Sequence, residues 1–147
     1  MNNYPQTVLS DSVYFRQMEL YVESQYHRGR PYIGEYLDEV TGYWLKGDQE
    51  RSRYYNHSTF NDLIITGLIG LRPRLDNTIE VNPLIPADKW DWFCLDNLLY
   101  HGHYLTILWD KNGDRYHCGK GLRIFVNGKE AGHADTLTRL VCENALK

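Results

Sequence analysis

The chain has 147 residues, of which 42% are hydrophobic, and a formal net charge of -3. A chain of this length buries roughly 70% of its unfolded surface, which is enough for one compact domain or two small subdomains. The modest charge lacks the basic excess of a nucleic-acid-binding protein, and there is neither a run of about 18 apolar residues nor the pattern of a signal peptide. We therefore expect no nucleic-acid or membrane partner, and the sequence leaves the cellular compartment open.

The first predicted element is a helix over residues 11–27. Phe15, Met18 and Val22 recur at helical spacing, and the polar residues 10–12 offer N-caps. These apolar side chains are expected to form the buried face of the helix.

A long connection follows this helix. Gly29 and Pro31 end the helical pattern, and no period persists from there to Asn56. Connections of this length within compact domains are usually functional or disordered, and this one is too rich in aromatic residues for disorder. We therefore expect it to be functional.

The second helix is predicted over residues 58–71, with Pro73 ending it. Ser58 or Thr59 can cap its start, and Asp62 suits the positive end of the helix dipole. Together with the first helix it would form an αα-hairpin. Its apolar face comprises Phe60, Leu63, Ile64, Gly67, Leu68 and Leu71.

The sequence after Pro73 predicts antiparallel strands. A short strand lies within residues 77–86, two strands flank a turn near His101, and a hairpin turns at Asn127-Gly128, a pair that suits a type I′ turn. We therefore predict an α+β fold with a helical domain over residues 1–73 and a β domain over residues 74–147.

The stretch "GEYLDEVTGYW", residues 34–44, carries the sharpest motif. Followed by "YYNHSTFNDLIITGLIGL", "IEVNPLIP" and a β-rich tail, it resembles the C-terminal end of inverting glycosidases with six-hairpin (α/α)6 barrels: the mannosylglycerate-hydrolase-like group, glycoside hydrolase family 63 and the trehalases. That group carries E-N-Y-N-P-x-T-G, and Glu35, Thr41 and Gly42 keep its spacing. Tyr36 stands one place early for the aromatic residue, and Asp38-Glu39 replace Asn-Pro.

The resemblance implies a fold and a chemistry. The chain would be an αα-hairpin from an incomplete (α/α)6 barrel, followed by a small antiparallel β cap. Inverting hydrolysis uses one protonated and one ionised carboxyl group about 6.5–9.5 Å apart. The resemblance implies that Glu35 is the water-activating base, whereas the acid is an aspartate of an earlier barrel hairpin. The chain would then be inactive alone and would need the remaining hairpins of a parent chain.

Further candidate residues flank Glu35 along the sequence. Tyr36, Trp44 and Tyr55 can stack on a sugar, and Asn56 and His57 can hydrogen-bond its hydroxyl groups. The alternatives are barrel packing for Trp44, helix capping for Asn56 and crevice filling for His57.

No cofactor and no metal site are predicted. His101 and His103 share one face of a strand but lack further zinc ligands.

The function predicted from the sequence is thus part of an inverting O-glycoside hydrolase that acts on an oligosaccharide or other glycoside. The alternative is a non-catalytic carbohydrate-binding or structural cap module. Because helix faces that normally meet neighbouring hairpins would be bare, we also expect the isolated chain to self-associate.

Overall fold

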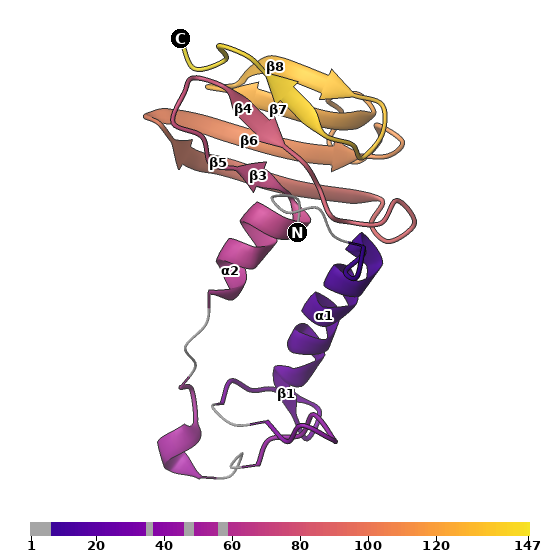
Figure 1. The fold of residues 1–147 in the computed structure, drawn as a ribbon, viewed down its shortest axis with the longest axis vertical. Helices are drawn as coiled ribbons and strands as arrows, with labels where there is room; N and C mark the ends of the chain where they lie inside the picture. The colour runs from indigo at the N-terminus through magenta and orange to yellow at the C-terminus, as the bar shows by residue number, and fades with distance from the viewer. Residues whose placement is uncertain (1–6, 35–36, 46–48, 56–58) are drawn as a thin grey trace. The chain divides into compact units, whose positions relative to one another are not determined.

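The computed structural model describes residues 7–34, 37–45, 49–55 and 59–147, and it divides into two compact units, Met1–Thr59 and Phe60–Lys147. The described residues form α-helices and three small antiparallel sheets, so the predicted α+β class is confirmed (Figure 1). The predicted domain division falls after residue 73, on the far side of the second helix, and remains a prediction.

Helix α1 (Asp11–Ser24) opens the first unit. The backbone N–H of Val13 donates to Oγ of Ser10 at 3.3 Å, which confirms an N-cap among residues 10–12. Phe15 and Met18 are buried as expected, but Val22 is exposed.

Helix α1 ends earlier than the sequence predicts because a small hairpin follows it. Strand β1 (Tyr26–His27) pairs antiparallel with β2 (Arg30–Pro31). Arg28 and Gly29 form the turn with φ of 52° and 73°, left-handed values that a helix cannot contain. Among the described residues of the first unit, a 3₁₀-helix, η1 (Glu50–Ser52), follows this hairpin.

The second helical segment begins as α2 (Phe60–Leu63) and continues as the π-helical turn η2 (Ile64–Leu68). The N–H of Ile69 donates to the carbonyl of Ile64 at 2.9 Å, a five-residue step.

The predicted end of this second helix at Pro73 is wrong. Gly70 has a φ of 84° and therefore stops the helix, so Leu71 lies in a strand instead of on the apolar helix face.

Seven strands form two sheets in the second unit (Figure 1). The three-stranded sheet has the order β3-β4-β9, and the four-stranded sheet has the order β5-β6-β7-β8. All neighbouring strands are antiparallel. The bounds are β3 (Leu71–Arg72), β4 (Ile79–Val81), β5 (Trp92–Tyr100), β6 (His103–Asp110), β7 (Gly121–Val126), β8 (Lys129–Ala134) and β9 (Leu140–Cys142).

Both predicted hairpin turns are confirmed. His101 and Gly102 connect β5 to β6, and Asn127 and Gly128 connect β7 to β8, all four with positive φ. The sequence did not predict strand β9.

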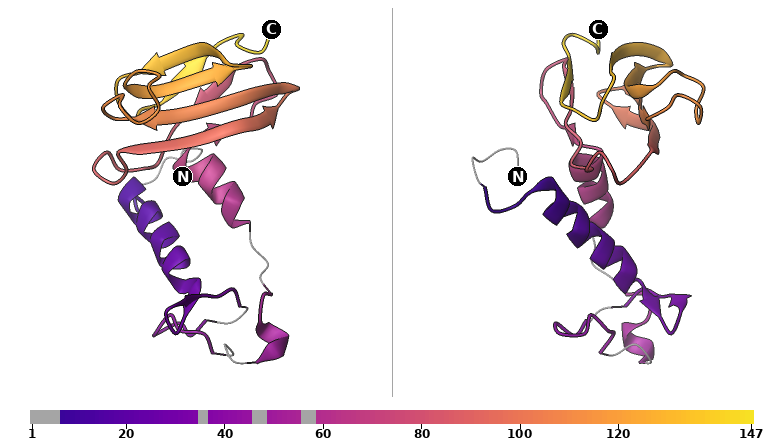
Figure 2. Two further views of the ribbon diagram at one scale, coloured as in Figure 1. Left: turned by 180° about the vertical axis from the view of Figure 1, so that it is seen from behind. Right: turned by 90° about the vertical axis from the view of Figure 1, so that its right-hand side faces the viewer.

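The core of the second unit lies between its two sheets, which form separate layers (Figures 1 and 2). A Cβ placed on Gly132 of β8 would lie 2.6 Å from Sγ of Cys142 in β9, so the layers approach closely there. The fully buried apolar side chains come from both sheets: Ile79 and Val81 from β4, Leu105 and Ile107 from β6, and Leu122 and Ile124 from β7.

An ion-pair network holds the three-stranded sheet together. Glu80 of β4 accepts hydrogen bonds from Arg74 at 2.9 Å and from Arg139, just before β9, at 2.8 Å. The Arg139 guanidinium, helped by Arg74, lowers the pKa of Glu80 despite partial burial.

Helices α1 and α2 belong to different units, so their pairing as a barrel hairpin remains a prediction. Within the described ranges, no helix has both the length and the apolar character needed to cross a membrane.

Candidate functional site

The connection between α1 and α2 is folded back on itself by backbone contacts. Gly34 forms an antiparallel bridge with Arg53, and the N–H of Tyr54 donates to the carbonyl of Ile33 at 2.8 Å. A second bridge joins Leu37 to Trp44. The described parts of the predicted functional loop therefore form two arms that meet beside residue 34.

Four of the predicted site residues lie outside the described residues: Glu35, Tyr36, Asn56 and His57. The structure does describe their neighbours on both sides, Gly34 and Leu37 for the first pair and Tyr55 and Thr59 for the second. The roles of these four residues remain predictions.

Trp44 is packed inside the first unit. Its side chain is 7% exposed, its ring meets Tyr32 edge-on with 5.3 Å between centroids, and it also lies against Gly34. Between the two roles considered for Trp44, packing agrees with these contacts, and a contact with substrate remains a prediction. Tyr55 is 44% exposed, which leaves part of its ring accessible.

Asp38 shapes the turn that follows position 35. Its Oδ1 accepts hydrogen bonds from the N–H and Oγ1 of Thr41, at 2.7 and 2.9 Å, and from the N–H of Val40 at 3.0 Å. The backbone N–H of Thr41 contributes most to lowering the pKa of the Asp38 carboxyl group. Thr41 of the glycosidase-like motif thus has a structural partner in Asp38.

A polar hollow of about 490 Å³ lies where the two arms of the connection meet. Three of its lining residues are arginines: Arg28 and Arg30 from the β1–β2 hairpin and Arg53 from the returning arm. Sequence reasoning missed these arginines because Arg53 is 23 positions away from Arg30. The local sign of this hollow in the sequence was the pair of arginines on either side of Gly29 in "HRGR".

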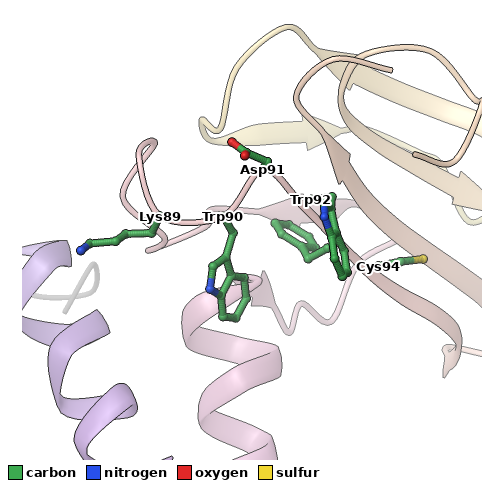
Figure 3. Close-up of a pocket in the computed structure, with 6 residues that line it drawn as sticks. Lys89, Trp90, Asp91, Trp92 and Cys94 are labelled. Atoms are coloured by element: carbon green, nitrogen blue, oxygen red, sulfur yellow. The ribbon is translucent and has the colours of Figure 1, made fainter. Parts of the chain in front are cut away.

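A second hollow, of about 520 Å³, lies at the start of β5 (Figure 3). Trp90 and Trp92 point to one side of the chain, and Asp91 points to the other (Figure 3). The Arg115 guanidinium covers the Trp92 ring at 4.4 Å, and Nε1 of Trp109 donates to the Trp90 carbonyl at 3.0 Å. These contacts anchor the segment to its own sheet.

The described part of the chain holds no group of three or more His, Cys, Asp or Glu side chains arranged to bind a metal ion. His103 instead contacts Nδ2 of Asn127 at 3.0 Å, beside the β7–β8 turn.

Comparison with known proteins relates both parts of the chain to glycoside hydrolases. Residues 6–58 match a family described as the mannosylglycerate hydrolase MGH1-like glycoside hydrolase domain. Residues 71–133 match the C-terminal domain of glycosyl hydrolase family 65. The chain is therefore glycoside-hydrolase-related, but these matches do not support the narrower likeness to family 63 or to the trehalases.

A solved structure named as a sialidase is similar to the chain throughout. The two are 96% identical, with a TM-score of 0.94, over 99% of this chain. The chain spans 14% of the length of that sialidase.

Proposed function

We propose that the chain is the C-terminal part of a larger inverting O-glycoside hydrolase, in which it supplies the general base and part of a sugar subsite. This proposal rests on the order of the two glycoside hydrolase family matches along the chain. A glycoside hydrolase domain covers the segment with Glu35, Thr41 and Gly42, and a C-terminal domain of a glycoside hydrolase family follows it.

The proposed substrate is an oligosaccharide or other glycoside, because both matched families are glycoside hydrolases. The chain covers 14% of the protein named as a sialidase, so the sugar is left to the substrate panel described below. A parent of comparable length would supply the other barrel hairpins, and the chain alone would be inactive.

In the proposed mechanism, Glu35 takes a proton from the water that attacks the anomeric carbon. An aspartate of the parent protonates the departing oxygen from the opposite side of the sugar ring.

The test of this function is turnover by the parent protein carrying Glu35→Gln, assayed on sialosides and on neutral glycosides. General-base catalysis contributes about 10²–10⁴-fold, so kcat should fall by that factor. Glu39→Gln is the matched control, because it removes an exposed carboxylate four positions away, and it should retain kcat within about twofold. Full turnover by Glu35→Gln would remove Glu35 from the mechanism.

The second candidate is a non-catalytic carbohydrate-binding or structural cap module. The packing of Trp44 against Tyr32 favours the structural form of this candidate, since a buried indole supports the fold. The sequence of the parent discriminates between the two candidates. Helical hairpins with an aspartate in a barrel loop upstream of this chain favour hydrolysis.

A further inference from the structure

Cys94 of β5 lies on the outer face of the four-stranded sheet. Its neighbour Phe93 is matched with Trp109 of β6, and both side chains are buried, so Phe93 faces the core. Because successive residues of a strand point to opposite faces, Cys94 and its cross-strand partner Leu108 face away from that core. Leu108 is nevertheless only 4% exposed. Another part of the chain therefore covers the outer face beside Cys94.

The covering segment is the loop between β6 and β7, residues 111–120. At the β5 side of the sheet, the guanidinium group of Arg115 lies 4.4 Å from the ring centroid of Trp92. Trp92 shares a face with Cys94 because it lies two positions earlier in the same strand, at the start of β5 (Figure 3). The first half of the loop is therefore attached beside Cys94.

The far end of this loop rests on β7. A Cβ placed on Gly119 would lie 2.5 Å from Nη2 of Arg123, and Arg123 is matched with Leu108 across the sheet. The loop thus crosses the outer face from β5 to β7 and covers Leu108, the cross-strand partner of Cys94. Cys118, the residue before Gly119, is thereby brought onto the same face as Cys94.

Both of these thiols are free and accessible. Cys94 and Cys118 are exposed, whereas Cys142 is buried, and none of the three is in a disulfide in the structure. The Asp110 carboxylate accepts three backbone N–H groups of the loop and so fixes its path. The Cys118 thiol itself donates only a weak hydrogen bond, to the carbonyl of Tyr116 at 3.4 Å. Little therefore holds this thiol in its reduced position.

The ionisation of neighbouring groups agrees with this arrangement. Burial raises the pKa of the Cys94 thiol, and the Asp96 carboxylate and the thiolate form of Cys118 raise it further. Burial also raises the pKa of Tyr116, and the thiolate form of Cys94 adds to that effect. Because salt screens such effects over about 10 Å, these groups lie near Cys94.

We infer that Cys94 and Cys118 form a reversible disulfide that fastens the β6–β7 loop to strand β5. The two cysteines belong to different elements, and the register of the sheet and the contacts of the loop bring them onto one face. Under reducing conditions both remain thiols, as in the structure. The disulfide forms when the protein meets a low-molecular-weight disulfide such as oxidised glutathione.

The chemistry is thiol–disulfide exchange in two steps. The Cys118 thiolate attacks one sulfur of oxidised glutathione and releases one glutathione thiolate, which leaves a mixed disulfide on Cys118. Cys94 then gives its proton to the solvent and attacks the Cys118 sulfur, which releases the second glutathione thiolate. The two protein thiols are oxidised to one disulfide, and one oxidised glutathione is reduced to two thiols.

The test uses the parent protein, equilibrated with mixtures of reduced and oxidised glutathione, quenched with acid and digested with trypsin. Cleavage after Lys89, Lys111, Arg115 and Lys120 places the two cysteines on separate peptides, 90–111 and 116–120. Mass spectrometry should find these peptides joined, with a mass lower by two hydrogen atoms than their sum. Dithiothreitol should separate them again.

Two single variants provide the controls. In Cys94→Ser, Cys118 should stop at the mixed disulfide with glutathione, because the second thiol is missing. Cys142→Ser should keep the link between 90–111 and 116–120, because Cys142 is buried in β9 of the other sheet.

Hydrogen exchange tests whether the disulfide fastens the loop. Amides of residues 111–120 should exchange about tenfold more slowly in the oxidised protein than in the reduced one, because the link suppresses local opening. Amides of β4, in the other sheet, should exchange at the same rate in both forms.

Two results would overturn the inference. One is wild-type protein that carries a separate glutathione on each of the two cysteines and no joined peptides. The other is a joined pair whose formation leaves exchange in the loop unchanged. Neither result depends on Glu35 or on turnover, so the inference stands or falls separately from the proposed function.

Discussion

Asp110, at the end of β6, is the one charged residue among the fully buried side chains described. Its carboxylate accepts backbone N–H groups of the loop that follows, from Gly113 at 2.8 Å and from Arg115 and Tyr116 at 2.9 Å. Burial acts to raise the pKa of Asp110, but these donors outweigh it and lower the pKa. A single carboxylate therefore organises the connection between β6 and β7.

Replacing this carboxylate should destabilise the second unit. Asp110→Ala leaves the three N–H groups without their acceptor, and a buried donor without a partner costs about 1–3 kcal/mol. We expect a total loss of about 2–4 kcal/mol in the free energy of unfolding, measured by chemical denaturation. Asp114→Ala, in the same loop but exposed, is the control and should change stability by less than about 0.5 kcal/mol. Equal stability of the two variants would contradict the role of Asp110.

The same residue makes stability depend on pH. Because the folded pKa of Asp110 is lowered, its contribution is complete above the unfolded pKa of about 3.9 and is lost as pH falls through the folded value. The unfolding temperature should therefore drop on acidification below about pH 4, and the drop should be smaller in Asp110→Asn. Identical acid profiles for wild type and variant, followed by circular dichroism, would count against this assignment.

Gly70 decides where the second helical segment ends and how it meets β4. Its φ of 84° suits glycine, and a Cβ there would collide with the carbonyl group of Asn82. The N–H of Asn82 donates to the Gly70 carbonyl at 2.8 Å, so the close approach is part of the sheet junction.

Gly70 and Gly102 have similar φ values, so comparing alanine substitutions at the two positions distinguishes the cost of backbone strain from the cost of close packing. Gly102 has a φ of 80°, but a Cβ there would meet nothing within 4 Å. Gly102→Ala should cost about 1 kcal/mol from φ alone, and Gly70→Ala should cost clearly more because the backbone must also move. Thermal unfolding of both variants checks this prediction, and equal losses would mean that the contact with Asn82 is not tight.

The accuracy of prediction differed between elements for a physical reason. The turns at His101-Gly102 and Asn127-Gly128 are local, so neighbouring residues suffice to predict them. Strand β9 has three residues and pairs with β4 across some sixty positions, which no local pattern reports. For the same reason the sequence did not show that Arg53 lies near Arg30, because the two are far apart along the chain and are brought together by the bridge between Gly34 and Arg53. The motif around Glu35 could be recognised because all its residues lie within one short stretch of the sequence.

At the scale of the whole molecule, helix α1 leaves apolar side chains uncovered. Val13 and Leu20, seven positions apart on the helix, are each 41% exposed. Such faces are typical of interaction surfaces, and the longer parent proposed above offers neighbouring helices to cover this one.

The isolated chain should therefore self-associate. In sedimentation velocity, the wild-type chain should form dimers or larger species at high concentration, and Val13→Asn/Leu20→Asn should shift it toward monomer. Val40→Asn is the control, because Val40 is more exposed but lies in a loop turn away from the helix. A monodisperse wild-type monomer would contradict this prediction.

The most direct test of the account is the pH dependence of kcat/KM in the parent protein, with and without Glu35→Gln. A general base works only when ionised, so kcat/KM of the wild type should decrease at acidic pH. This acidic limb of the pH profile should reflect protonation of the Glu35 carboxylate. We predict that Glu35→Gln lowers the plateau by about 10²–10⁴-fold and abolishes the acidic limb that belongs to the base. A variant that keeps both the plateau and the limb would contradict the assignment of Glu35 as the base.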